Sequence, residues 1–406
     1  MITILHKQPM KQNNDSLKNS RLPSTIHRFL QPFSGLIILF CLIVLNGCIV
    51  QFTPETEEEK ELLVVEGLIT DQPGPNTIKL STSLPFGKKS EAKPLTGCSV
   101  SLKDDLGNLY PLSEKGAGTY VTNPSAFRGQ AGRFYTLKIR TDNGAKVINY
   151  ESSPVEMKPV PPIDSIYYEK TVIKEGFGNY FGIDGCDIFL DTHDPENKCK
   201  YYRWDFNETW ILRLLFPVEN IKCWVSDTST SINFKSTAAF DEARIIRHPV
   251  ASITNTTDRL KIKYSISVNQ YSLNEDEYIY WEKLQNITDQ VGGLYDVIPA
   301  SVPGNVFCID NPGERVLGYF SVSARSSKRI FIRDNFAGIV NLYPDCPVDT
   351  VYGDVEIWGL GESIWVLSDN PPSFGSPRRR ILTDKKGCAD CTVRGTNIKP
   401  EFWIGD

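Results

Sequence analysis

The chain has 406 residues, of which 40% are hydrophobic and 23% are charged, and its formal net charge is −5. This composition excludes a disordered chain, a collagen-like chain and a multi-pass membrane protein. The acidic balance argues against nucleic-acid binding, which needs a basic surface to neutralise phosphates. At about 100–200 residues per domain, the length predicts two or three domains.

The first 47 residues have the pattern of an export signal. Five basic residues and a single acid precede an unbroken apolar run over residues 36–45. That run is shorter than the about 20 residues that a membrane-spanning helix needs, and a basic stretch before a short apolar run is typical of a signal peptide. The run ends in Leu45-Asn46-Gly47-Cys48, which resembles the bacterial lipobox. We therefore expect residues 1–47 to be removed and Cys48 to be lipidated.

Two acyl chains of the palmitate type on Cys48 would hold the protein stably at a membrane, whereas one chain holds only weakly. The alternative is an ordinary cleaved signal in which Cys48 is incidental. Removal of residues 1–47 takes away five basic residues and one acid and leaves a net charge of −9. Residues 51–61 are polar and acidic, and this composition predicts a solvated tether over residues 48–61.

Eight cysteines remain when Cys41 of the leader and Cys48 are set aside. In an exported chain an even number favours disulfides, although the pairing stays open. Cys388 and Cys391 form a C-x-x-C and are our candidates for a disulfide. A redox site would need this motif at a helix start in a βαβ unit, and a zinc site would need a second ligand pair, which the sequence does not offer. Structural disulfides are therefore favoured over a metal site or free thiols.

Catalytic motifs are absent from the sequence, and after removal of the leader only His193 and His248 remain. This scarcity argues against a serine or cysteine hydrolase, whose nucleophile needs a positioned imidazole. Residues 191–197 could hold Ca²⁺ through oxygens, but Asp-Pro followed by Asn is also a plain turn, which we favour. We predict no catalytic, cofactor-binding or metal site and no enzyme. A carboxylate pair for glycoside hydrolysis stays open, because such pairs converge in space and not in sequence.

The pattern after the tether predicts an immunoglobulin-like β-sandwich over residues 62–156. Short alternating segments are separated by turn residues, and Asn-Gly before an extended run is a strong hairpin signal. The expected strands are 62–69, 76–81, 99–102, 109–112, 119–121, 133–140 and 146–150. The expected core contains Val64, Leu68, Ile78, Val100, Leu102, Tyr120, Tyr135, Leu137 and Ile139.

A proline-rich joint over residues 157–162 predicts a domain boundary, and residues 163–406 predict a larger β-rich domain with one prominent helix. The whole chain is therefore predicted to be mainly β. Strands are expected at 201–212 and 260–271, and a hairpin is expected from 316–324 and 329–333. The tail from residue 343 onward is rich in Pro, Gly and Cys and is expected to wrap over this domain, pinned by disulfides.

The predicted helix begins after Asn274, a candidate cap, with Glu277 three residues on in the arrangement of a capping box. It ends at a pair of glycines, 292–293. Its apolar stripe is Tyr280, Leu284, Ile287 and Val291. The aromatic residues Tyr278, Tyr280 and Trp281 could stack on a ligand, but packing against a sheet is the favoured interpretation.

Several stretches together resemble the Bacteroidota outer-membrane lipoproteins of domain of unknown function 4249. They lie at residues 63–67, at Asn197 with 201–204, at 270–273, at 280–281 with Leu284, at 304–306 with Cys308, at 316–320, at 388–391 and at 395–403. The resemblance implies an outer-membrane lipoprotein that neighbours TonB-dependent transporters. It implies no catalytic residue, because the family has no assigned activity.

We therefore expect a lipid-anchored accessory protein of the outer membrane, associated with a TonB-dependent barrel in the capture or uptake of an unknown substrate. Exposure at the cell surface is favoured, since an acidic stretch after the cysteine resembles a surface-export signal of such lipoproteins. The alternatives are a free-standing surface-binding or adhesion module and a cryptic glycan-processing hydrolase. No cofactor and no nucleic-acid partner is expected, and the ligand stays open.

Overall fold

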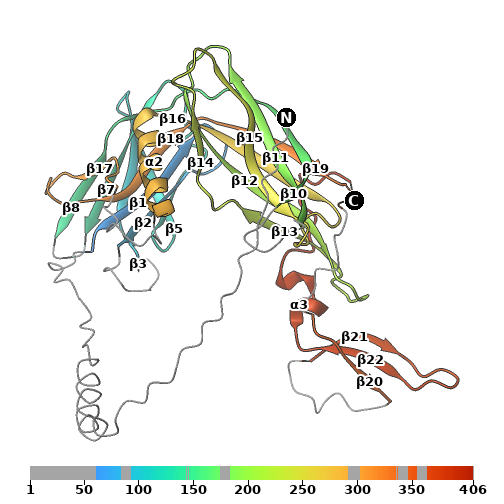
Figure 1. The fold of residues 1–406 in the computed structure, drawn as a ribbon. Coiled ribbons are helices and arrows are strands. Elements are labelled where there is room, and N and C mark those ends of the chain that lie inside the picture. The colour runs from blue at the N-terminus through green and yellow to red at the C-terminus, as the bar shows by residue number, and fades with distance from the viewer. Residues whose placement is uncertain are drawn as a thin grey trace, which may run out of the picture. The chain divides into compact units, whose positions relative to one another are not determined.

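The computed structural model describes residues 61–83, 93–142, 144, 146–173, 183–290, 302–334, 336, 346–353 and 364–405. All of them lie in the second of two compact units, 60–406, the first being 1–59. The predicted mainly β fold is confirmed: strands dominate the described residues, and α2 (Glu275–Gln290) is the long helix among them (Figure 1). Cys48 and the tether lie outside the described residues.

The first part of the chain forms a sheet that folds over a core. Strand order β1-β2-β6-β5 on one side and β4-β7-β8 on the other is that of an immunoglobulin constant-type domain, and β5 also pairs with β4. All seven strands predicted from the sequence are present. The bounds are β1 Leu63–Thr70, β2 Thr77–Thr82, β3 Lys93–Pro94, β4 Ser99–Asp104, β5 Leu109–Gly116, β6 Thr119–Thr122, β7 Phe134–Asp142, β8 Val147–Ser152 and β9 Val155–Glu156.

Two strands from far along the chain extend this first sheet. β17 (Val306–Cys308) pairs with β8, and β18 (Leu317–Ser323) pairs in parallel with β1. Residues of both strands belong to the first core. The domain boundary at 157–162 therefore stays a prediction. Not all strands beyond it belong to a separate second domain, because residues 306–323 return to the first sheet.

Most of the predicted core of the first sandwich is correct. Seven of the nine residues are buried: Ile78, Val100, Leu102, Tyr120, Tyr135, Leu137 and Ile139. Val64 and Leu68 were wrong, because β1 buries the alternate residues Leu63, Val65 and Ile69. Side chains alternate along a strand, so a phase error of one residue turns both to the outer face.

The second part forms two sheets packed on a separate core. One sheet has the order β10-β11-β15, and the other has the order β13-β12-β16-β19 with β14 also paired to β12. Side chains from both sheets form one buried cluster. The bounds are β10 Ile163–Ile173, β11 Ile183–Asp194, β12 Tyr201–Arg213, β13 Lys222–Thr228, β14 Asn233–Ser236, β15 Ala243–Thr254, β16 Tyr264–Leu273 and β19 Arg325–Ile332.

The predicted hairpin at 316–324 and 329–333 is wrong. β18 and β19 are both strands, but β18 pairs with β1 of the first sheet and β19 pairs with β16 of the second. Ser326 and Ser327, expected in the turn, lie inside β19 opposite Gln270 and Asn269. The chain changes sheets at the buried residue Ala324, so two adjacent strands never meet as a hairpin.

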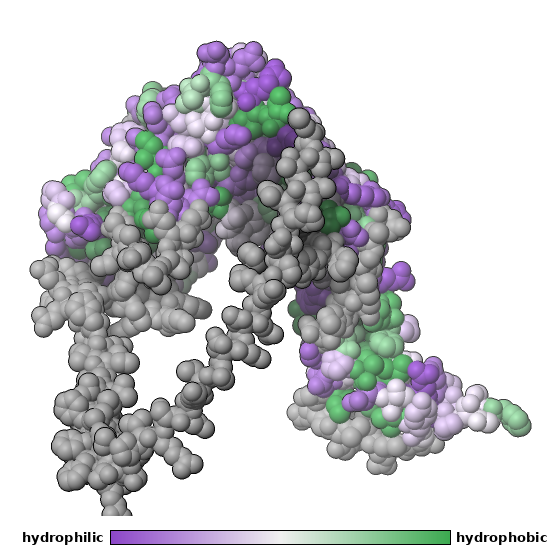
Figure 2. All heavy atoms as spheres, viewed as in Figure 1, coloured by the Kyte–Doolittle hydropathy of each residue, from purple (hydrophilic) through white to green (hydrophobic). Residues whose placement is uncertain are grey.

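The end of the C-terminal tail, from Cys391 onward, packs on the second sheet, as expected for this part of it. Trp403 is buried against Trp224 and Phe331, and Thr396 exchanges two backbone hydrogen bonds with Trp224. Before it come β20 (Asp349–Tyr352), β21 (Trp365–Asn370), β22 (Arg379–Thr383), α3 (Lys386–Ala389) and a 3₁₀ turn, Cys391–Val393. The tip of the β21–β22 hairpin, where Phe374 is exposed, is hydrophobic in Figure 2.

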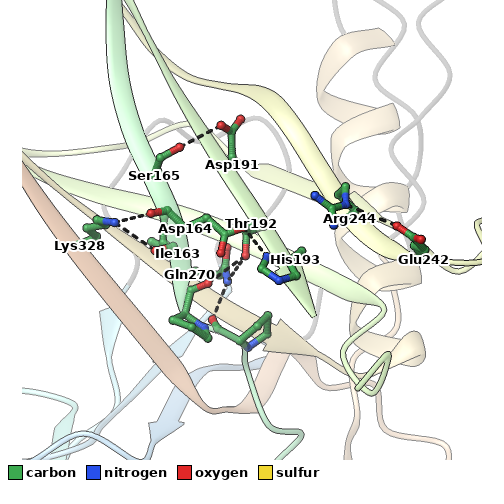
Figure 3. A network of polar contacts seen from close by, with 12 residues as sticks. Ile163, Asp164, Ser165, Asp191, Thr192, His193, Glu242, Arg244, Gln270 and Lys328 are labelled. Carbon is green, nitrogen blue, oxygen red and sulfur yellow. Dashed lines mark hydrogen bonds and ion pairs between the residues drawn. The ribbon is translucent and has the colours of Figure 1, made fainter. Parts of the chain in front are cut away.

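The proline-rich joint is held firmly between the two cores. Three side chains at alternate positions of β16 and just after it donate to carbonyls of the joint and of Glu156 directly before it. Gln270 Nε2 donates to Pro161 O at 2.9 Å, Ser272 Oγ to Lys158 O at 2.5 Å, and Asn274 Nδ2 to Glu156 O at 2.8 Å. The same amide of Gln270 donates to Thr192 Oγ1 at 3.0 Å, in the network that Figure 3 shows. The joint is therefore a fixed connection and not a free spacer.

Close backbone packing fixes β18 in its place. Asn305 pairs with both backbone groups of Phe320: the Phe320 N–H donates to Asn305 Oδ1 at 2.9 Å, and Asn305 Nδ2 donates to Phe320 O at 2.8 Å. Gly318 has φ +82°, and a Cβ there would lie 2.1 Å from Val65 O. Any side chain at 318 would therefore push β18 away from β1.

We predict that Gly318→Ala lowers the free energy of unfolding by about 3 kcal/mol, the sum of a left-handed backbone and a backbone clash. The matched control is Gly107→Ala, at φ +87° with nothing within 4 Å of its Cβ, which should cost only about 1 kcal/mol. Urea unfolding of the two variants measures both values. Equal losses would contradict the close contact between β18 and β1.

Candidate functional site

A groove lies between helix α2 and the outer face of β1 and β18. Its volume is about 710 Å³, within the range of about 300–1,000 Å³ typical of ligand sites. Apolar side chains from both walls line most of it: Val64, Leu68, Tyr280, Trp281, Leu284, Ile287, Val302, Leu317 and Tyr319. The charged side chains of the lining are Glu66, Lys79, Arg203 and Asp205, and Thr77 and Ser321 are its neutral polar ones. This combination suits a ligand with an apolar body and a few polar groups.

The two residues misplaced in the predicted core help to form this groove. Val64 and Leu68 sit on the outer face of β1 and line the cavity. Gly67 lies between them, on the inner face, where a Cβ would approach Ile78 Cδ1 to 2.6 Å. The outer face of β1 is therefore apolar because it faces helix α2 across the groove, and not because it belongs to the core.

Helix α2 contributes its predicted stripe to the groove and not to a core. Tyr280, Leu284 and Ile287 line the cavity, and none of the hydrophobic clusters among the described residues contains a residue of α2. Tyr280 packs its ring on Tyr319 at 4.8 Å between centroids. The favoured interpretation of the aromatic residues, packing against a sheet, holds for Tyr280 on Tyr319 and for Tyr278, whose ring lies 5.1 Å from Tyr201 and 5.2 Å from Phe234. Leu284 and Ile287 line the cavity. Val291 lies outside the described residues.

The predicted capping box is not formed. Asn274 precedes the first helical residue as expected, but its amide donates to Glu156 O instead. Glu277 is fully buried, and its Oε1 accepts from Ser321 Oγ at 2.7 Å and from Trp281 Nε1 at 3.3 Å. The carboxylate therefore ties α2 to β18 and orients the Trp281 ring at the groove.

Burial raises the pKa of Glu277, while the nearby Arg203 charge and the two hydrogen bonds oppose that rise. Its Oε2 has no hydrogen-bond partner among the described residues. An unpaired carboxylate oxygen away from water disfavours the ionised form. The helix is thus joined to the sheet by a carboxyl group whose burial disfavours its ionised form.

We predict a pH-dependent stability difference between the wild type and Glu277→Gln. A raised folded pKa makes the contribution of Glu277 complete below its ordinary value of 4.5, and that contribution is lost as the pH rises through the folded pKa. The side chain of the variant cannot ionise at this position. Its free energy of unfolding should therefore rise relative to that of the wild type from pH 4.5 upward, by about 1.4 kcal/mol for each unit by which the pKa is raised. Thermal unfolding from pH 4 to 8 measures this, and a constant difference would contradict it.

The charged end of the groove is held by strand β12. Arg203 lies directly opposite Tyr271 of β16, and its guanidinium stacks on that ring at 4.7 Å and faces the Trp281 ring at 5.4 Å. Asp205, two residues on, accepts from Asn269 Nδ2 at 2.7 Å. The alternation of β12 puts Arg203 and Asp205 on the same face, toward the groove.

The candidate disulfide residues are both oxidised, but not with each other. Cys391 bonds to Cys223 of β13, and Cys388 bonds to Cys346. Cys98, Cys186, Cys199 and Cys308 are free. The C-x-x-C motif therefore places two adjacent crosslinks in the tail, one of which fastens it to the second sandwich.

We predict that the double variant Cys223→Ala/Cys391→Ala lowers the free energy of unfolding by about 3–5 kcal/mol, because the crosslink spans 168 residues of chain. Denaturant unfolding compares it with Cys98→Ala, a change at a half-exposed free thiol, which should cost far less. A double variant as stable as the wild type would show that the tail needs no crosslink.

The other sequence candidates are structural. Asp194 Oδ2 accepts from the backbone N–H groups of Lys198 and Cys199, both at 2.7 Å, so residues 191–197 contain a turn. His193 Nδ1 lies 2.6 Å from Asp164 Oδ2, as Figure 3 shows. Burial, and then the charge of Lys235, lower the pKa of His248 to about 4, and its ring packs on Trp204. Among the described residues no group of three His, Cys, Asp or Glu side chains could hold a metal ion.

The family model for the domain of unknown function DUF4249 matches residues 49–329, and the chain belongs to this family. A search of curated proteins finds no match. The match covers both sandwiches and the groove walls, whereas the C-terminal stretches at 388–391 and 395–403 lie beyond it. In the part of the chain that the structure describes, no helix is long and apolar enough to cross a membrane.

Sequence reasoning missed Arg203 as a site residue, although 201–204 was among the stretches that carry the resemblance. The signal was a charged residue inside an otherwise aromatic run, Tyr201-Tyr202-Arg203-Trp204. A charged side chain on a half-buried strand needs a partner or a ligand. The sequence does not show which elements face it, because Tyr271 and Trp281 come from separate segments.

Proposed function

We propose that this protein is a lipid-anchored accessory protein of the outer membrane that captures cargo for a TonB-dependent transporter and catalyses no reaction. The observation that carries the proposal is the apolar run of residues 36–45 that is followed by Asn46-Gly47-Cys48. A diacylated cysteine followed by an acidic tether would hold residues 62–406 beside the membrane surface. The resemblance to Bacteroidota lipoproteins supports the transporter partner and the cell-surface location.

The covalent structure supports export. Two disulfides join segments that are 168 and 42 residues apart in sequence. Disulfides persist in oxidising compartments outside the cytoplasm and are rare inside it. The crosslinks therefore fit a protein that leaves the cytoplasm before it finishes folding.

The groove supports capture. It combines aromatic rings with a stacked arginine, which is a common composition of binding sites. Nearly all of its lining comes from strands of both sandwiches and from α2, with Val302 the residue from a connecting segment, so most of its geometry is set by regular elements. Capture requires such a preformed surface and needs no nucleophile or general base.

We predict that the anchor depends on Cys48 alone. Metabolic labelling with an alkyne analogue of palmitate should mark the wild type and Cys41→Ala equally and should not mark Cys48→Ala. Cys41 is the matched control because it lies in the apolar run 36–45, only seven residues before Cys48. Label on Cys48→Ala, or none on the wild type, would contradict the anchor.

The transporter partner is tested by isolating the acylated protein in mild detergent and identifying what comes with it. A single TonB-dependent barrel at near-equal abundance is the expected result. Isolation of an acylated protein without any barrel would contradict the accessory role and favour a free-standing surface-binding module.

A further inference from the structure

The side chain of Arg203 lines the groove, and no counter-ion is bonded to its guanidinium among the described residues. No hydrogen bond or ion pair joins its guanidinium to another described residue, and its Nε is buried without a partner. By comparison, Arg133 pairs with Asp104 at 3.1 Å and Arg329 donates to Ser265 Oγ at 2.8 Å, whereas Arg325, which does not line the groove, also has a buried Nε without a partner. Leaving guanidinium donors unsatisfied costs free energy unless water or a ligand takes them.

The setting of Arg203 favours a bound anion. Its guanidinium lies over the rings of Tyr271 and Trp281, at 4.7 and 5.4 Å, and stacking on aromatic rings leaves the edge of a guanidinium for hydrogen bonding. Glu277 is close enough for its charge to act on Arg203, but its Oε1 is hydrogen-bonded to Ser321 and Trp281, and no ion pair joins it to Arg203. A planar, pre-oriented guanidinium binds a carboxylate through two parallel hydrogen bonds.

The surrounding charges limit how much negative charge the ligand can carry. Besides Arg203, the groove is lined by one further cation, Lys79, and by two acids, Glu66 and Asp205. Asp205 is hydrogen-bonded to Asn269 and lies two residues from Arg203 on the same strand face. A polyphosphate or another polyanion would meet both acids at close range, whereas a single carboxylate meets one guanidinium.

The rest of the groove is suited to an apolar body. Leu284 and Ile287 of α2 stand opposite Val64 and Leu68 of β1, and Tyr280 and Tyr319 stack beside them. Covering apolar surface that is open to water is favourable, so an apolar ligand body lowers the free energy of the complex. The volume of about 710 Å³ admits a chain of several apolar groups.

We propose that the groove binds a monocarboxylate with an apolar body, whose carboxylate pairs with Arg203 and whose body lies along α2 and β1. A fatty acid and the free C terminus of a hydrophobic peptide share this chemistry. The proposal rests on the proposed capture function for its biological meaning, but it concerns binding by the protein alone and needs no transporter.

Isothermal titration of the purified full chain tests it with two matched pairs of probes. The first pair is decanoate and decanamide, and the second is the peptide acetyl-Ala-Leu-Phe with a free carboxylate and the same peptide as its amide. In at least one pair the acid should bind about tenfold or more tightly than the amide, the equivalent of about 1.4 kcal/mol. The pair that shows this preference identifies the source of the carboxylate.

The preference should disappear in Arg203→Gln and persist in Arg329→Gln, the matched control, since Arg329 also stacks on an aromatic ring, Phe402, but lies outside the groove. If Arg203→Gln does not fold, the comparison of acid with amide in the wild type still decides. Equal affinity of acid and amide, or no binding of any probe below about 1 mM, would overturn the proposal. Acid-selective binding by a protein isolated without a barrel would overturn the accessory role and leave this inference standing.

Discussion

The row of Gln270, Ser272 and Asn274 is the constraint on which the site depends. These three side chains hold the carbonyls of Pro161, Lys158 and Glu156, so the connection between the two sandwiches is bonded to β16 along its length. The alternate spacing of the three residues matches the two-residue period of a strand. Each bond satisfies a backbone carbonyl of a segment whose prolines give it few donors of its own.

The consequence for the groove is geometric. One wall of the groove comes from β1 and β18 of the first sheet, and Arg203 comes from β12 of the second. Because Asn274 directly precedes α2, the same row of bonds also fixes where the helix begins. The groove thus depends on the two sandwiches being joined rigidly. Within it, Glu277 joins α2 to β18, and Asn305 holds β18 through the backbone of Phe320.

Local pattern was enough to predict the first sandwich, because turn residues and alternation mark each of its seven strands. It was insufficient wherever a distant segment decides the outcome. Val64 and Leu68 were placed in the core because an apolar outer face on β1 has no local explanation, and only α2, more than 200 residues away, supplies one. Glu277 has the spacing of a capping box, yet Ser321 and Trp281 bind it instead. The β18–β19 hairpin failed for the same reason, since each strand pairs with a different distant partner.

The central claim is that the groove is the surface through which this protein meets its cargo. A photoreactive amino acid introduced at Ile287, which lines the groove, tests this in living cells against the same residue at Ile246, which is exposed on β15 outside it. The account predicts crosslinked products from position 287 and none from position 246. Equal crosslinking at both positions, or crosslinking at 246 alone, would contradict it.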